Sequence, residues 1–169
     1  AGCQADPVTG AQAVPIYQTT AYAFHSTEHA RQLFSLEAEG NIYTRINNPT
    51  TAALEARVAA LEGGVGAVAF ASGHAALVAT VMAICNAGDE IVTSSSLYGG
   101  TYNLFATTLP KWGITARFVE SGDLAGFRRA ITPRTRLIFG EVIGNPRLDM
   151  FDIAGVAAIA HEHGLPLVI

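Results

Sequence analysis

The 169-residue chain is half hydrophobic, only 14% charged, and carries a formal net charge of −4. The acidic balance and the lack of a basic stripe argue against a nucleic-acid partner, and so high an apolar content is typical of an oligomer or of part of a larger protein. Cys3 and Cys85 lie far apart in the sequence, which argues against a disulfide framework and favours a reducing, cytoplasmic compartment.

A long uncharged run covers residues 63–88, which contain no Asp, Glu, Lys or Arg. The run is long enough to span a membrane. It holds five glycines, however, and the Ser72-Gly73-His74 break divides it into the lengths of a strand and a helix. We therefore expect a soluble chain with no membrane partner.

The first 64 residues are expected to form an amino-terminal arm and two helices. Residues up to about 22 show no helical period and carry Pro7 and Pro15, which predicts an extended arm without a core of its own. The helices are expected at 27–38, capped by Ser26 or Thr27 and ended by Gly40, and at 51–62, capped by Thr50 or Thr51 and ended by Gly63-Gly64. His25 and His29 have helical spacing, but His25 precedes the first cap, so we expect no metal site.

From about residue 65 the chain alternates between short apolar runs and helical segments. The expected strands are 67–70, 90–94, 115–119, 136–141 and 165–169, and the expected helices are 75–85, 101–109, 124–130 and 153–163. This alternation predicts an α/β fold with a largely parallel sheet flanked by helices on both faces. Because the pattern stops inside a strand, we expect residues 65–169 to be the first part of a domain that continues beyond them.

A strand-to-helix turn at Ser72-Gly73 is the first candidate binding site. The amides at the start of a helix and the positive end of its dipole form a natural anion site, most often for phosphate. A plain N-cap explains the same two residues without any ligand. The rest of the chain has to decide between the two interpretations.

Other polar segments are expected at the carboxyl ends of the strands, where ligands of parallel α/β sheets bind. They are Leu97-Tyr98-Gly99-Gly100, Ser121-Gly122 and Glu141-Val142-Ile143-Gly144-Asn145-Pro146. Taken alone, Tyr98 is equally a turn aromatic packed on the sheet edge, and Asn145 is more often part of an Asn-Pro turn. Arg45, in the loop before the second helix, is alone more often a solvated arginine.

Four segments occur in one order and at compatible spacings. They are Tyr43-Thr44-Arg45-Ile46-Asn47-Asn48-Pro49-Thr50, Ala71-Ser72-Gly73, Leu97-Tyr98-Gly99-Gly100-Thr101, and Glu141 followed by Gly144-Asn145-Pro146. Together they resemble the pyridoxal-phosphate enzymes of cysteine and methionine metabolism, from about Val14 to the last residue. Within that family the motifs are most similar to the O-acetylhomoserine sulfhydrylase group.

The resemblance implies the amino-terminal part of a fold-type I transferase, with an extended arm followed by a parallel-rich sheet. It also implies pyridoxal 5'-phosphate as the cofactor, an amino-acid substrate, and a cytoplasmic homo-oligomer, a tetramer, whose active sites form between two chains. Residues 1–64 would contribute to the neighbouring subunit, and residues 65–169 would begin the cofactor-binding large domain.

The resemblance assigns the phosphate of the cofactor to two places. Ser72, Gly73 and His74 would hold it with helix-start amides. Tyr43 and Arg45 would reach the phosphate bound in the neighbouring subunit, where a guanidinium fork suits its geometry.

The cofactor ring is assigned to Tyr98 and Asn145. By resemblance, Tyr98 would stack on the pyridine ring and assist proton transfer at the leaving group, which makes it the one catalytic candidate. Asn145 would donate a hydrogen bond to the ring hydroxyl. Glu141 is expected to have at most a supporting role.

The reactive half of the family's site is missing from the sequence. In the family, the lysine that forms the Schiff base, the aspartate that pairs with the pyridine nitrogen and the arginine that binds the substrate carboxylate lie beyond residue 169. Lys111 is the only lysine present, between Pro110 and Trp112, and is a poor substitute. We expect these 169 residues alone to be inactive.

For the intact enzyme, the resemblance implies replacement of the acetate of O-acetylhomoserine by sulfide or a small thiol, which yields homocysteine or methionine. A cystathionine or methionine γ-lyase, or a cystathionine γ-synthase, is the nearest alternative. A non-catalytic module for dimerisation or phosphate binding is the alternative of another class. A nucleotide-binding Rossmann domain is a weaker one, because no G-x-G-x-x-G follows the first strand.

Overall fold

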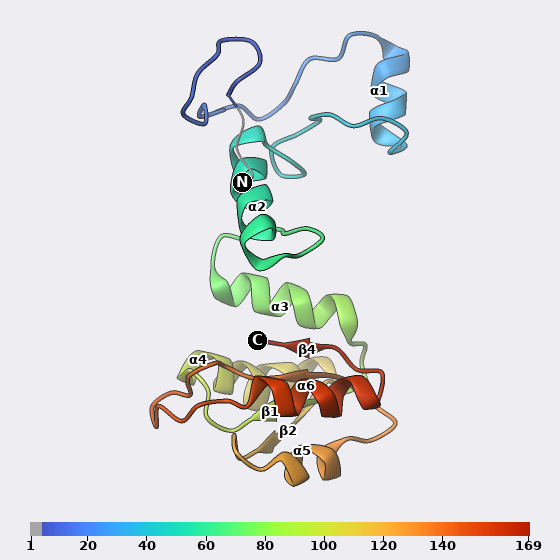
Figure 1. Cartoon of the computed structure of the whole chain (residues 1–169). Helices are drawn as coiled ribbons and strands as arrows, with labels where there is room; N and C mark the ends of the chain where they lie inside the picture. The colour runs from blue at the N-terminus through green and yellow to red at the C-terminus, as the bar shows by residue number, and fades with distance from the viewer. Residues whose placement is uncertain (1–4) are drawn as a thin grey trace. The chain divides into compact units, whose positions relative to one another are not determined.

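The computed structural model describes residues 5–169, which form two compact units (Figure 1). Unit 1 is Ala1–Phe70 and unit 2 is Ala71–Ile169. Cys3 lies outside the described residues, and Cys85 is buried with a free thiol. Within residues 5–169 there is no helix long and apolar enough to cross a membrane, and no group of three or more His, Cys, Asp or Glu side chains placed to hold a metal ion.

Unit 1 consists of an arm and two helices, α1 (Thr27–Phe34) and α2 (Pro49–Glu62). An antiparallel bridge pairs Ala21 of the arm with Tyr43 of the loop between the helices. The arm also contacts the start of α2, where the Thr50 hydroxyl donates to the Pro15 carbonyl oxygen at 2.8 Å and accepts from the Tyr17 amide at 2.9 Å. Polar contacts with the backbone of the extended arm therefore hold the arm against the loop and α2 within unit 1.

The N-cap of α1 is Ser26, one of the two residues expected, and its side chain accepts from the His29 amide. The expected cap of α2 was wrong, because Asn48 occupies that position and its side chain accepts from the Thr50 amide. Pro49 explains the shift, since proline is favoured at the first helical position, where the residue has no amide to leave unpaired.

The strand expected at residues 67–70 is absent from the described chain. The Ala69 amide instead donates to the Glu55 carboxylate at 2.8 Å. A strand exists only as part of a ladder, and no other segment within residues 5–169 pairs with this run. Its two large side chains stay exposed, Val68 by 74% and Phe70 by 47%.

Unit 2 is built on a four-stranded parallel sheet in the order β2-β1-β3-β4. The strands are β1 (Glu90–Ser94), β2 (Thr115–Val119), β3 (Thr135–Phe139) and β4 (Leu167–Val168). The helices are α3 (Gly73–Ile84), α4 (Gly99–Asn103), α5 (Leu124–Ala130) and α6 (Ile153–Glu162). This arrangement confirms the predicted α/β class with parallel pairing.

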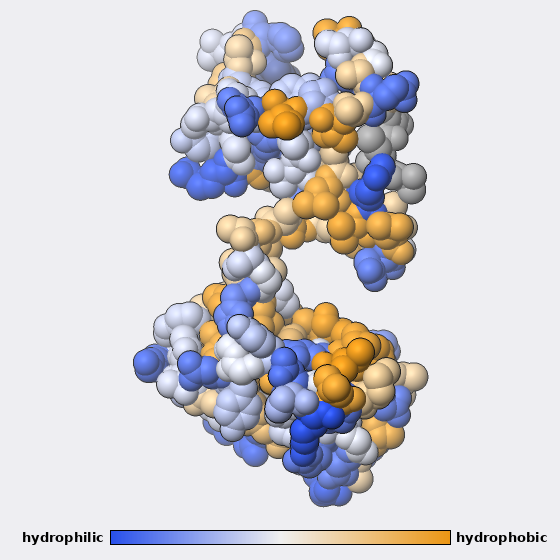
Figure 2. Space-filling model, turned by 90° about the vertical axis from the view of Figure 1, so that its left-hand side faces the viewer, coloured by the Kyte–Doolittle hydropathy of each residue, from blue (hydrophilic) through white to orange (hydrophobic). Residues whose placement is uncertain are grey.

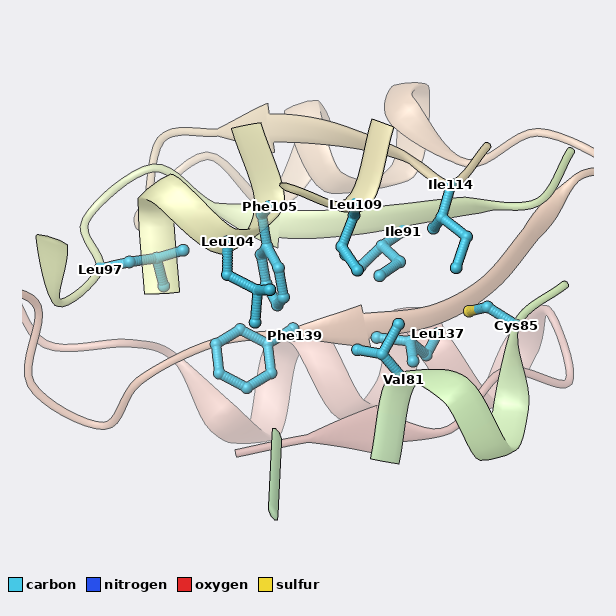
Figure 3. Packing of buried hydrophobic residues seen from close by; sticks show 10 residues of the cluster. All are labelled: Val81, Cys85, Ile91, Leu97, Leu104, Phe105, Leu109, Ile114, Leu137 and Phe139. Atoms are coloured by element: carbon cyan, nitrogen blue, oxygen red, sulfur yellow. The ribbon is translucent and has the colours of Figure 1, made fainter. Parts of the chain in front are cut away.

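Alternate residues of the strands face two separate cores. Ile91, Leu137 and Phe139 pack with Val81 of α3, with its C-cap Cys85 and with the segment after α4 (Figure 3). On the other face, the neighbouring strand residues Val92 and Ile138 pack with α5 and α6, whose contributions include Phe127, Val156 and Ile159. The two-residue period of the strands thus produces the helix–sheet–helix layers.

The helix expected at 101–109 is divided into three short pieces. These are α4, a π-helical turn at Leu104–Thr108 and a 3-10 turn at Leu109–Trp112. Pro110 accounts for the change at the last piece, because proline has no amide for a hydrogen bond along an α-helix. Buried Phe105 and Leu109 direct these turns onto the sheet.

Candidate active site

Four polar segments of unit 2 lie at or beside the carboxyl edge of its sheet. They are the start of α3, the segment after β1, the turn after β2 and the loop after β3. Hydrogen bonds and ring contacts join these segments to one another. The resulting set contains five of the seven residues that the sequence predicts for a cofactor site.

The start of α3 presents backbone amides to an open surface. The Ser72 side chain caps the helix by accepting from the Ala75 amide at 3.1 Å. The amides of Gly73 and His74 precede the first hydrogen bond inside the helix, from the Ala76 amide to the Ser72 carbonyl oxygen, so they have no acceptor within the helix. A Cβ at Gly73 would meet nothing within 4 Å. Exposed amides, a helix dipole and open space fit an anion such as phosphate.

Tyr98 is held from three sides. Its amide donates to both carboxylate oxygens of Glu141, at 3.0 and 2.9 Å. Its ring meets the His74 ring edge-on, with centroids 6.0 Å apart. A Cβ at Gly100 would lie 2.6 Å from the Tyr98 ring and 2.8 Å from the His74 ring, so the ring contacts the α4 backbone at a place that only glycine fits. With 56% of its surface exposed, Tyr98 is accessible to a planar ligand.

Asn145 lies at the tip of a short hairpin formed by residues 142–151. Ile143 and Met150 form an antiparallel bridge, and the Gly144 amide donates to the Asp149 carbonyl oxygen at 2.8 Å. The Asn145–Pro146 peptide bond is cis. Asn145 itself is exposed, so its amide group is accessible beside the carboxyl end of β3.

Buried hydroxyls lie beneath this hairpin. Ser94 and Ser121 share a hydrogen bond at 2.7 Å, and the Ser96 hydroxyl donates to Asp149 Oδ1 at 2.5 Å. The hydroxyls of Ser121 and Ser96 hold the pKa of the Asp149 carboxyl below its ordinary value, because they stabilise the charged form. The Ser95 hydroxyl is buried with no hydrogen-bond partner within residues 5–169.

Tyr43 and Arg45 lie together in unit 1. The Arg45 guanidinium carbon is 5.1 Å from the centre of the Tyr43 ring, a cation–π contact. Both residues line a pocket of about 330 Å³ whose other walls are mainly apolar, formed by Ala21, Tyr22, Phe24, Phe34, Ile42 and Ile46. Arg45 is exposed, which leaves its guanidinium group accessible to an anion.

Lys111 lies away from these segments. It belongs to the 3-10 turn that ends at Trp112, shortly before β2 begins at Thr115, and so lies at the amino edge of the sheet. The site segments follow the strands at the opposite edge. Lys111 is therefore not a member of the candidate site.

The pairing of Ser96 with Asp149 was not predicted from the sequence, whereas Glu141 has the supporting contact expected of it, with the Tyr98 amide. One signal was present, because Ser94-Ser95-Ser96 is an unusually polar run at the end of a buried strand. Nothing local connects it to Asp149, which is 53 residues away.

A family model described as Cys/Met metabolism PLP-dependent enzyme matches residues 1–169. The chain belongs to this family. It is 55% identical over 168 residues to an O-acetyl-L-homoserine sulfhydrylase of Leptospira meyeri, covering 99% of this chain and 38% of the relative. It is 49% identical over 170 residues to an O-acetyl-L-homoserine sulfhydrylase of Corynebacterium glutamicum, covering 100% of this chain and 39% of the relative.

Solved structures of the family have the same fold. A putative O-acetylhomoserine (thiol)-lyase of Campylobacter jejuni, which contains a pyridoxyl-lysine phosphate group, matches with a TM-score of 0.94 and 36% identity. The match covers 99% of this chain and 42% of that one. A cystathionine gamma-lyase of Lactobacillus plantarum matches with a TM-score of 0.88, 36% identity and the same coverage. The chain thus spans about two fifths of the length of the relatives it matches.

Proposed function

We propose that this chain is the amino-terminal part of a pyridoxal-phosphate enzyme that converts O-acetylhomoserine and sulfide, or a small thiol, to homocysteine, or methionine, and acetate. The observation that carries this proposal is the 55% identity to an O-acetyl-L-homoserine sulfhydrylase across nearly the whole chain. A Saccharomyces cerevisiae homocysteine/cysteine synthase, 46% identical over 94% of the chain and 36% of its own length, supports the same chemistry.

In this proposal the start of α3 binds the phosphate of the cofactor. The Gly73 and His74 amides donate to phosphate oxygens, and Ser72 holds them in place by capping the helix. The open space at Gly73 supports this assignment, since an anion can approach the amides without displacing a side chain.

Tyr98 and Asn145 would bind the ring of the cofactor. Tyr98 would stack on the pyridine ring and assist proton transfer at the leaving group, supported by its exposed ring and its fixed backbone. Asn145 would donate from its side-chain amide to the ring hydroxyl. The bound cofactor would supply an electron sink for the substrate carbon atoms, with the covalent attachment provided by a lysine outside these 169 residues.

Residues 1–64 would contribute Tyr43 and Arg45 to the phosphate bound in a neighbouring subunit, with residues 65–169 beginning the large domain. Their contact with each other, their shared pocket and the accessible guanidinium group of Arg45 support a role as a phosphate-binding pair. Unit 1 leaves apolar side chains exposed, among them Leu54, Leu61 and Val65, and both units carry apolar surface in Figure 2. Such exposure fits a surface that is covered by the rest of a longer protein or by a neighbouring subunit, and we propose a homo-oligomer, a tetramer, in the cytoplasm.

The full-length protein provides the test. We expect it to bind pyridoxal phosphate with a visible absorption band, and to produce homocysteine from O-acetylhomoserine and sulfide. Arg45→Ala should weaken cofactor binding about tenfold, because a charge-assisted contact to the phosphate is lost, whereas Arg128→Ala, which changes an exposed ion pair elsewhere, should have no effect. A full-length protein that binds no pyridoxal phosphate would favour the non-catalytic alternative.

A γ-lyase is the second candidate function. The likeness to the Lactobacillus plantarum cystathionine gamma-lyase, with a TM-score of 0.88, favours it. Assays of the same preparation with O-acetylhomoserine plus sulfide and with cystathionine separate the two. Faster turnover of cystathionine would replace the sulfhydrylase proposal with the lyase.

A further inference from the structure

The hairpin at residues 142–151 is anchored by a hydrogen bond to a buried serine beneath it. Asp149 lies on its returning side, next to the bridge residue Met150, and its carboxylate accepts from the hydroxyl of Ser96, which is 97% buried after β1. The Ser96 amide in turn donates to Ser94 Oγ at 3.1 Å. These contacts fix the base of the hairpin to the end of a central strand of the sheet.

The backbone at Gly144 packs directly against the Ser96–Asp149 hydrogen bond. A Cβ at this position would overlap both Ser96 Oγ and Asp149 Oδ1. The Gly144 carbonyl oxygen accepts from the Leu148 amide at 2.9 Å, and Leu148 takes a φ of 58°, a value that L side chains rarely adopt. Such a conformation persists where the surrounding contacts determine it, and the Ser96–Asp149 hydrogen bond is one of these contacts.

We propose that Asp149 is a positioning residue that holds Asn145 toward the cofactor ring, acting through its hydrogen bond with Ser96. The inference rests on the proposed function, because it needs a cofactor ring for Asn145 to bind. Asp149 does not itself touch the ring. It fixes the two strands of the hairpin, and the four residues between Gly144 and Asp149 then have little freedom to move the Asn145 amide.

For this role Asp149 needs an oxygen that accepts the hydrogen bond from Ser96, but it does not need its negative charge. Ser96→Ala and Asp149→Ala each remove the Ser96–Asp149 hydrogen bond, and Asp149→Ala also removes the interaction with the Ser121 hydroxyl, so the double variant should be no worse than Asp149→Ala alone. Asp149→Asn keeps an oxygen that accepts from Ser96. Thr132→Ala is the matched control, since the Thr132 hydroxyl also donates to a carboxylate, that of Glu90 at 2.8 Å, but at the other edge of the sheet.

Two measurements on the full-length protein test the proposal. Hydrogen exchange of the peptide containing residues 142–151, measured without cofactor, should be about tenfold faster in Ser96→Ala and Asp149→Ala than in wild type. The dissociation constant of pyridoxal phosphate, measured by equilibrium dialysis, should rise about tenfold in the same variants. Asp149→Asn should stay within about twofold of wild type in both measurements, and Thr132→Ala should change neither.

Unchanged exchange and unchanged affinity in Ser96→Ala and Asp149→Ala would overturn the proposal. So would an Asp149→Asn variant that fails like Asp149→Ala, or a Thr132→Ala variant that weakens the cofactor as much. Failure of the proposed function is seen separately, because wild-type protein would then bind no pyridoxal phosphate, while the exchange measurement would still report whether Asp149 holds the hairpin.

Discussion

The two edges of the sheet in unit 2 differ in how their buried polar groups are paired. At the amino edge the Glu90 carboxylate, 2% exposed, is paired with Arg117 at 2.6 Å and with Arg134, and it accepts from Thr132. A second pair joins Arg136 to Asp89 at 3.0 Å. At the carboxyl edge the buried groups are mostly serine hydroxyls.

The difference separates stability from ligand binding. Arg117 and its neighbours lower the pKa of Glu90 to about 2, so the buried carboxylate at this edge is satisfied by partners within the chain. At the carboxyl edge Gly73, His74 and Tyr98 remain exposed. We infer that the amino edge stabilises the fold and that the carboxyl edge carries the chemistry.

Glu90→Gln has the largest expected effect, and it tests whether the amino edge contributes to stability and not to cofactor binding. It removes the charge that the arginines stabilise, and should lower the free energy of unfolding by about 2 kcal/mol, less than the full pKa shift implies because the arginines are partly exposed. Denaturant midpoints of the full-length protein measure the loss. The affinity for pyridoxal phosphate should not change, and a weakened affinity would mean that the two edges are coupled.

The pH dependence of the same variant sharpens the result. The pKa of Glu90 is depressed in the folded state, so its contribution is fully present above the unfolded value of about 4.5 and is lost as the pH falls toward about 2. Wild type and Glu90→Gln should therefore differ most above pH 4.5 and converge below it. A difference that persists at pH 2 would show that Glu90 acts by packing and not by charge.

Gly100→Ala tests the carboxyl edge through Tyr98. Its Cβ would displace the Tyr98 and His74 rings, and we expect about tenfold weaker binding of pyridoxal phosphate, equivalent to about 1.4 kcal/mol. Gly66→Ala is the matched control, because Gly66 lies outside the segments of the candidate site and a Cβ there meets nothing within 4 Å. If the two variants bind pyridoxal phosphate with equal affinity, Tyr98 does not contribute to cofactor binding.

Ser72→Ala has the smallest expected effect. Loss of the cap of α3 should cost about 1 kcal/mol of stability and weaken cofactor binding about fivefold, since the phosphate-binding amides lose their support. Ser26→Ala removes a similar cap from α1 and should lower stability without altering affinity, as thermal unfolding and equilibrium dialysis would show. If Ser26→Ala weakens the cofactor equally, capping at α3 has no special link to the site.

Local sequence was sufficient where neighbouring residues make the interactions. The strands at 90–94 and 115–119 and the helix at 124–130 lie where the sequence predicted them, because a short apolar run, an alternating run and a helical period are each visible in neighbouring residues. The Ser72 cap was predictable for the same reason, since the bond to the Ala75 amide spans three residues. Family motifs indicated which residues to examine at the site, and their proposed roles stay predictions.

By itself, then, the sequence determined the α/β class, the polar segments at the strand ends and the family. The tertiary structure decided which of these segments meet. Glu141 accepts from the Tyr98 amide across 43 residues, and Asp149 accepts from Ser96 across 53. It also decided that residues 67–70 form no ladder within the described chain. The physical reason is the same in each case, because a local turn carries its own partners, whereas a long-range hydrogen bond exists only once the order of the strands has brought distant residues together.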